Sequence, residues 1–177
     1  MKKLNQLLVF FGLIVCAQAN AQLYAGAAIG LTDADGDTET SGMYRFFAGY
    51  RLLDFLALEV AAVGFGNLES ELGNASSDVE GYEYGIVGIF PFKDTHEVYL
   101  RLGMSHWEAD TQNGESGLSR ESNVITGDDL TYALGYAIEI SDMGAAKIEL
   151  SRYDIDVDGF MDVDTIDTIS FGLEARF

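Results

Sequence analysis

The chain of 177 residues carries 29 aspartate and glutamate residues against 10 lysine and arginine residues, which gives a formal net charge of −19. This acidic excess argues against nucleic-acid binding, which needs basic patches facing phosphate. The length fits one domain, and no apolar stretch reaches the roughly 18 residues that a membrane-spanning helix needs.

The N-terminal segment has the pattern of a secretory signal peptide. Lys2 and Lys3 precede the short apolar run from Leu7 to Val15, and two overlapping Ala-x-Ala sites end at Ala19 and Ala21. We expect cleavage after Ala21, with Ala19 as the alternative, so that residues 1–21 are removed and residues 22–177 form the mature domain. The only cysteine, Cys16, lies within this segment and is expected to be removed with it. We do not expect lipidation of Cys16, because a lipidation site requires a small residue before its cysteine and Val15 occupies that position.

The mature chain contains eight segments in which apolar and polar residues alternate. In the eighth, the odd positions from Ile169 to Phe177 are apolar and the even positions from Thr168 to Arg176 are polar or glycine. Repetition of this pattern predicts an all-β fold, an eight-stranded antiparallel up-and-down transmembrane β-barrel that is apolar outside. The predicted strands are residues 23–32, 43–52, 56–66, 81–90, 97–109, 129–140, 146–157 and 160–177.

The connections alternate between short turns and long polar loops, as in bacterial outer-membrane barrels. The last connection carries Asp158-Gly159, which is typical of a two-residue type I′ hairpin. Pairing Val157 with Phe160 would place Lys147 opposite Ser170 and Glu149 opposite Thr168, with the polar faces of both strands inward.

The inward face predicted by this alternation carries a balanced set of charges. The interior of an eight-stranded barrel is just wide enough to be filled by side chains, and unpaired charges there would be costly. Balanced pairs of charges therefore predict a plugged lumen. Four other acidic residues are expected outside the lumen, at the short-turn rim: Asp54, Asp94, Glu97 and Asp142. The predicted lumen ion-pair network comprises Arg45, Arg51, Arg101, Lys147 and Arg176 with Glu59, Glu83, Glu139, Glu149 and Glu174.

Residues 90–111 resemble the fourth turn region and fifth strand of the OmpA transmembrane domain. The match is Tyr99-x-Arg-Leu-Gly followed by Trp107-x-Ala-Asp-Thr, with weaker similarity at Phe47-Ala-Gly-Tyr-Arg, Leu58-Glu59 and the closing Arg176-Phe177. The chain is similar to this porin-family group over its mature length. The resemblance implies an eight-stranded barrel whose inward ion pairs plug or gate the lumen.

Within this resemblance, Glu59, Arg101, Lys147 and Glu149 would belong to the ion-pair network. An inward lysine of the family corresponds to Val87 here, so exchange of Glu59 between two basic partners is not expected. The chain ends with the last strand, so we expect no periplasmic peptidoglycan-binding domain and no cell-wall anchoring.

Aromatic residues on the outward face are expected to form girdles at the membrane interfaces. A patch that binds sugars or a receptor is the alternative. Trp107 points inward and is expected to cap the lumen. The predicted interface aromatics are Tyr44, Tyr82, Tyr84, Tyr132, Tyr136, Phe171 and Phe177.

Two acidic segments resemble calcium loops, because hard cations favour clustered carboxylates. In the second segment Thr165 occupies the twelfth position, where a bidentate glutamate is required, so we expect solvated loops screened by divalent cations and no specific metal or cofactor. The weak candidate ligands are Asp33, Asp35, Asp37, Asp154, Asp156 and Asp158.

Catalysis is not expected from the two histidines. His96 lies in a predicted turn and is expected to be solvated, and His106 faces outward near Glu108. Ser105 points inward, so it cannot act with His106 in the way that lipid A-modifying barrels use a serine and a histidine.

We therefore expect a monomeric outer-membrane barrel of a Gram-negative bacterium, with a structural and surface-interaction role through acidic extracellular loops. The alternatives are a narrow pore for ions or small solutes and, second, a lipid A-modifying enzyme. Expected partners are outer-membrane lipid and lipopolysaccharide, with divalent cations as candidate bridges, and the barrel-assembly machinery through Phe177.

Overall fold

The structure, a computed structural model, describes residues 22–34, 40–69, 75–113, 122–154 and 165–177. The predicted signal peptide lies outside these residues and stays a prediction. The described residues form eight strands, with the following bounds: β1 (Gln22–Ala34), β2 (Ser41–Leu53), β3 (Leu56–Glu69), β4 (Ala75–Lys93), β5 (His96–Asn113), β6 (Ser122–Ser141), β7 (Gly144–Asp154) and β8 (Thr165–Arg176).

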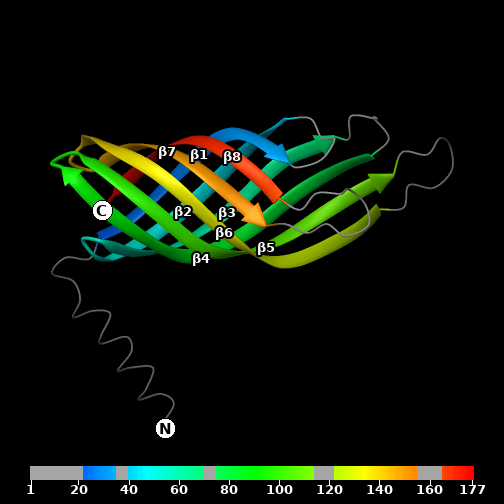
Figure 1. The fold of residues 1–177 in the computed structure, drawn as a ribbon, viewed down its shortest axis with the longest axis horizontal. Coiled ribbons are helices and arrows are strands. Elements are labelled where there is room, and N and C mark those ends of the chain that lie inside the picture. The colour runs from blue at the N-terminus through cyan, green and yellow to red at the C-terminus, as the bar shows by residue number, and fades with distance from the viewer. Residues whose placement is uncertain (1–21, 35–39, 70–74, 114–121, 155–164) are drawn as a thin grey trace, which may run out of the picture.

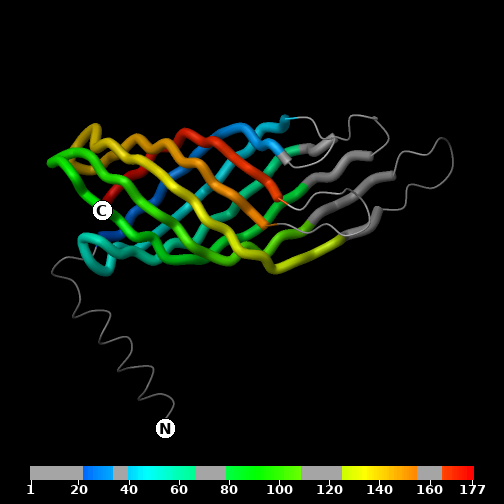
Figure 2. The backbone as a smooth tube through the Cα atoms, in the orientation of Figure 1, coloured from blue at the N-terminus to red at the C-terminus, as the bar shows by residue number. Residues whose placement is uncertain are grey.

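The strands form one closed antiparallel barrel, which confirms the predicted fold class. Each strand pairs with its neighbours in the chain, and β8 pairs with β1 to complete the ring (Figure 1). The strands run obliquely around the barrel (Figure 2). Within the part of the chain that the structure describes, no helix is long and apolar enough to cross a membrane.

One end of the barrel, here called the short-turn rim, is closed by two-residue turns at Asp54-Phe55, Asp94-Thr95 and Asp142-Met143. The C-terminus lies at this rim (Figure 1), where the Phe177 backbone N–H donates to the carbonyl oxygen of Leu23 at 2.8 Å. The opposite end is called the long-loop rim. The connections there, residues 35–39, 70–74, 114–121 and 155–164, lie outside the described residues.

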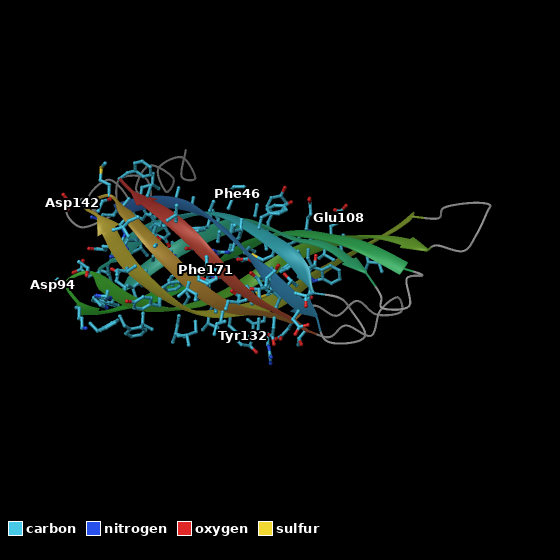
Figure 3. The ribbon with its side chains drawn as sticks, turned by 90° about the horizontal axis from the view of Figure 1, so that it is seen from above. Phe46, Asp94, Glu108, Tyr132, Asp142 and Phe171 are labelled. Atoms are coloured by element: carbon cyan, nitrogen blue, oxygen red, sulfur yellow. The ribbon has the colours of Figure 1, made fainter. Side chains whose placement is uncertain are left out.

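The described side chains alternate between the lumen and the outer surface along the strands, as the period of two requires. In β2, for example, Arg45 and Phe47 are buried while Tyr44, Phe46 and Ala48 are exposed. Phe46, Tyr132 and Phe171 are labelled on the outer face in Figure 3, and Asp94 and Asp142 are labelled at the short-turn rim. The inward and outward faces follow the alternation of the sequence.

The pairing of β7 with β8 differs from the prediction. Lys147 lies opposite Gly172 and Glu149 opposite Ser170, so the predicted register is wrong by two residues. A shift of two leaves every side chain on its predicted face, so alternation by itself cannot distinguish the two registers. Described pairing stops at Asp154 and Thr165, and the predicted Asp158-Gly159 turn lies outside the described residues.

Strands β4, β5 and β6 also extend further toward the long-loop rim than predicted. Their pairing continues to Ala75 opposite Asn113 and to Gln112 opposite Ser122, although the sequence there is too polar to show a membrane-facing stripe. Between β3 and β4 the register shifts near Gly66, which has a φ of 67°. A side chain there would be strained, and its Cβ would lie 2.5 Å from the Gly42 carbonyl oxygen, so this bulge requires glycine.

Candidate functional site

The middle of the lumen holds a buried cluster of two arginines and three glutamates, here called the central ion cluster: Arg45, Arg101, Glu59, Glu83 and Glu149. Arg45 Nη2 lies 2.6 Å from Glu59 Oε1, and Arg45 Nε lies 3.1 Å from Glu83 Oε2. Arg101 Nη1 lies 2.7 Å from Glu83 Oε2, and Arg101 Nη2 lies 3.0 Å from Glu149 Oε1. These five side chains are between 2% and 6% exposed, so the pairs are shielded from water.

Hydroxyl groups add hydrogen bonds to two of the three central carboxylates. The Tyr24 hydroxyl donates to Glu59 Oε2 at 2.9 Å, and the Ser151 hydroxyl donates to Glu149 Oε1 at 2.9 Å. Buried charges are tolerated when they are paired and further hydrogen-bonded. The five residues come from β2, β3, β4, β5 and β7, so the cluster bridges the lumen from side to side.

A second cluster, here called the rim ion cluster, lies toward the short-turn rim and comprises Arg51, Glu97, Glu139, Lys147, Glu174 and Arg176. Arg51 Nη2 lies 3.0 Å from Glu97 Oε2, and Arg176 Nη2 lies 2.8 Å from the same oxygen. Arg176 also pairs with Glu139 and, through Nε at 2.8 Å, with Glu174 Oε1.

The position of Glu97 corrects the sequence analysis. It was expected at the rim outside the lumen, but its side chain is 12% exposed and pairs with two arginines. It lies on the inward face because it shares the odd-numbered parity of Tyr99 and Arg101 in β5. The predicted balance of five basic and five acidic inward residues is therefore wrong, since Glu97 adds a further acidic residue to that face.

Lys147, a member of the rim ion cluster, lies in a cage of aromatic rings that sequence reasoning missed. Its Nζ is 4.3 Å from the ring centroid of Tyr99, 4.7 Å from that of Phe47 and 5.9 Å from that of Tyr24. The same Nζ lies 3.2 Å from Glu174 Oε2. Ring faces attract a cation, and the effect is stronger away from water.

Each ring of this cage lies over a glycine of the adjacent strand. Tyr24 is opposite Gly49, Phe47 is opposite Gly26, and Tyr99 is opposite Gly135. A Cβ on these glycines would lie 2.1 Å, 2.4 Å and 2.0 Å from the respective rings. Because these glycines have no side chain, the rings have space to lie across the narrow lumen. The pairing of inward aromatic residues with inward glycines on neighbouring strands is the sequence signal that could have predicted this cage.

Toward the long-loop rim the lumen is filled by apolar side chains, here called the apolar cap: Met43, Val63, Phe65, Val79, Trp107, Tyr153 and Ile166. Phe65 and Tyr153 pack edge to face, with ring centroids 4.7 Å apart. Trp107 is 1% exposed, as expected of a residue that caps the lumen, and its Nε1 donates to Asp129 Oδ2 at 2.6 Å. The other cap residues and Asp129 were not identified from the sequence, although their parity is inward.

A cavity of about 10 Å³ lies between Lys147, Arg45 and Glu149. That is close to the volume one water molecule needs. The position of the family's inward lysine is occupied by Val87, which is buried at 3% exposure and packs with Phe47 and Tyr99.

The predicted interface aromatics all lie on the outer face, but not all near strand ends. Tyr44 and Tyr82 lie toward the long-loop rim, and Tyr136 and Phe177 lie toward the short-turn rim. Tyr84, Tyr132 and Phe171 lie near the middle of β4, β6 and β8, which differs from the prediction. The exposed fractions of the residues Tyr44, Tyr82, Tyr84, Tyr132, Phe171 and Phe177 are 40%, 71%, 57%, 39%, 60% and 74%.

Only two of the six candidate metal ligands fall within the described residues. Asp33 and Asp154 are the two that the structure describes, whereas Asp35, Asp37, Asp156 and Asp158 lie outside the described residues. Among the described residues, no group of three or more histidine, cysteine or acidic side chains could hold a metal ion.

The two histidines have partners on the outer surface. His106 Nδ1 lies 2.8 Å from Asp128 Oδ1, and the neighbouring Ser105 is fully buried in the lumen, as expected. His96 is only partly exposed, which corrects the expectation of a solvated side chain. Its Nδ1 lies 2.5 Å from the Tyr136 hydroxyl, and its ring lies 5.6 Å from that of Phe92.

Comparison with known proteins agrees with this architecture. Neisserial surface protein A superposes with a TM-score of 0.65 at 15% identity, over 89% of this chain and 97% of that one. Ail of Yersinia pestis, in its complex with the heparin analogue sucrose octasulfate, has a TM-score of 0.59 at 17% identity, over 89% of this chain and 97% of the Ail chain. OprG of Pseudomonas aeruginosa has a TM-score of 0.59 at 12% identity, over 89% of this chain and 95% of the OprG chain.

These identities show a shared fold alone. None of the curated proteins compared with the chain is significantly similar to it in sequence. The family model described as the outer membrane protein beta-barrel domain matches residues 7–177, which is most of the chain. The chain therefore belongs to the outer membrane protein beta-barrel family.

Proposed function

We propose that this outer-membrane barrel is a non-enzymatic structural and surface-interaction protein whose lumen is closed to solutes. The observation that carries the proposal is the central ion cluster, which joins five strands across the lumen with side chains at most 6% exposed. The rim ion cluster and the apolar cap lie on either side of it. A solute would have to separate buried charge pairs and apolar side chains at successive levels.

The surface-interaction role is assigned to the long-loop rim, which faces the cell exterior in barrels of this kind. Its described outer face carries acidic side chains, among them Glu80, Glu108 and Asp128, and the Arg152–Asp167 pair at 2.5 Å. Loops on a rigid scaffold commonly carry binding specificity. Lipopolysaccharide bridged by divalent cations is the proposed partner, and Phe177 is the proposed contact for the barrel-assembly machinery.

The outer surface gives little support to a lipid A-modifying enzyme. His106 is paired with Asp128, and Ser105 faces the lumen on the other side of the sheet. A narrow pore is the stronger competitor, because a change of ion-pair partners could widen the lumen.

Single-channel conductance in a planar bilayer tests the closed lumen. We expect the folded chain to give no reproducible openings, with or without millimolar Ca²⁺. The double variant Glu59→Ala/Glu83→Ala should open the lumen, since Arg45 and Arg101 would lose carboxylate partners and attract water and anions. Asp167→Asn, on the outer surface, is the matched control and should stay silent.

Openings of the double variant would show that barrels insert in the bilayer under these conditions. The absence of openings from the unaltered chain would then indicate a closed lumen and not a failure to insert. Discrete, reproducible openings of the unaltered chain would overturn the proposal and make the protein a small pore.

A further inference from the structure

A groove of about 550 Å³ lies on the outer surface of the barrel, over strands β1 to β4. This size lies within the range of roughly 300–1,000 Å³ that is common for ligand sites. Its walls are formed by outward side chains, whereas the lumen lies on the other side of the sheet. It is therefore separate from the ion clusters and the apolar cap.

The strand register explains why the groove has this shape. One wall is a row of directly paired outward residues, Tyr50, Leu58 and Ile86, which Leu23 extends onto β1. Cross-strand neighbours of this kind pack side by side and form a continuous ridge.

The opposite wall is the next outward row, in which Ala48 pairs with Val60 and Val60 pairs with Tyr84. This ridge is low at Ala48, because a methyl group replaces the larger side chains found along the rest of both rows. The Ala48 methyl group therefore leaves this wall of the groove low at β2.

The floor between the two ridges is backbone. Gly49, Glu59 and Gly85 form the inward row between them. The two glycines have no side chain, and the Glu59 carboxylate points into the lumen, where it is 3% exposed. A ligand in the groove thus meets apolar walls and a backbone whose polar groups are paired in the strand ladder.

The groove extends from the short-turn rim toward the middle of the barrel. Leu23 and Leu58 lie near the beginnings of β1 and β3 at that rim, whereas Tyr84 and Ile86 lie near the middle of β4. Because strands of such barrels tilt by roughly 35–45°, a path across neighbouring strands rises through the membrane. Its direction is suitable for a hydrocarbon chain that enters from the membrane surface.

The surroundings of the groove decide its occupant. It is continuous with the outward apolar band, in which Leu23, Leu58, Val60 and Ile86 are 53%, 48%, 58% and 49% exposed. In the outer membrane protein beta-barrel family this band faces the bilayer, and short turns face the periplasm. The periplasmic leaflet of an outer membrane consists of glycerophospholipid, and lipopolysaccharide occupies the other leaflet.

We propose that this groove binds one acyl chain of a glycerophospholipid from the periplasmic leaflet. The chain lies between the Tyr50–Leu58–Ile86 ridge and the Ala48–Val60–Tyr84 ridge, with its headgroup beyond Leu23 at the short-turn rim. Burial of each methylene group contributes to retention of the lipid.

Native mass spectrometry tests the site. The folded protein is exchanged from phosphatidylethanolamine nanodiscs into detergent, and the fraction that retains one lipid is measured. Ala48→Phe fills the groove, and displacement of about two methylene groups should lower the retained fraction roughly tenfold. Ala27→Phe is the matched control, since Ala27 is an exposed outward alanine on β1 that lies opposite Phe46 and does not line the groove.

A second measurement needs no variant. In the unaltered protein with methyl-labelled alanine, the Ala48 methyl group should show nuclear Overhauser effects to lipid methylenes that are stronger than those of Ala27. Equal retention by both phenylalanine variants, or equal effects at both methyl groups, would overturn the site. Retention of lipid A in parallel nanodiscs, without retention of phosphatidylethanolamine, would overturn the assignment to the periplasmic leaflet.

Discussion

Arg101 and Glu83, on the neighbouring strands β5 and β4, form a buried ion pair in the middle of the lumen, with Nη1 and Oε2 2.7 Å apart. Arg101 also contacts Glu149 across the lumen, at 3.0 Å. One guanidinium thus compensates two buried carboxylates on different sides of the barrel. This arrangement makes stability depend more strongly on Arg101 than on any exposed charge.

Replacement of Arg101 by alanine should be severely destabilising. Removal of one partner of a buried pair leaves uncompensated charge, so we expect the free energy of unfolding to fall by about 3–5 kcal/mol. Equilibrium urea unfolding in lipid vesicles measures it. Arg152→Ala is the control, because Arg152 pairs with Asp167 on the outer surface at 44% exposure and should matter little. Equal losses for both variants would contradict the buried role of Arg101.

Replacement of Lys147 by methionine should be milder than loss of Arg101. Its partner Glu174 retains Arg176 at 2.8 Å, and a methionine side chain can occupy the cage of Tyr24, Phe47 and Tyr99. We expect a loss of about 1–2 kcal/mol in the same urea experiment. A loss as large as that for Arg101→Ala would show that Lys147 compensates more of the buried charge than its contacts indicate.

The aromatic rings that lie over glycines predict sensitivity to a single methyl group. In Gly135→Ala, the new Cβ would lie 2.0 Å from the Tyr99 ring, so the ring must move within a filled lumen. Such overpacking should cost about 1–3 kcal/mol of unfolding free energy. Gly42→Ala is the control, since no atom lies within 4 Å of a Cβ built there. If both variants unfold at the same urea concentration, the rings do not lie as described.

The only tryptophan, Trp107, reports on the interior of the barrel. Because it is 1% exposed and inside the lumen, its fluorescence should resist quenching both by aqueous iodide and by brominated acyl chains. Unfolding should shift its emission to longer wavelength and restore quenching by iodide. Strong quenching by brominated lipid in the folded protein would place Trp107 on the outer face instead.

A closed barrel with this interior should also resist detergent. Unheated protein should migrate differently from boiled protein on a detergent gel, because the paired strands survive dodecyl sulfate until heat separates them. The transition temperature should fall in Arg101→Ala and stay unchanged in Arg152→Ala. Identical migration before and after boiling would count against a stable membrane barrel.

The face that each residue occupies could be read from the sequence. Arg45, Glu59 and Arg101 are inward, and Phe46 and Leu58 are outward, because alternation along a strand is a local property with a period of two. Repeated over eight segments, it was sufficient to predict the barrel. The same alternation also holds for Glu97, which was misplaced because it lies next to a turn.

The tertiary structure decided which residues meet. Glu97 pairs with Arg176, 79 positions away in the sequence, and Lys147 lies opposite Gly172, two residues from the predicted partner. Such contacts depend on the stagger between strands when the sheet closes, and a shift of two residues leaves the alternation unchanged. The same closure brought Phe65, Trp107 and Tyr153 together in the apolar cap, since residues from distant strands become neighbours only across a narrow lumen.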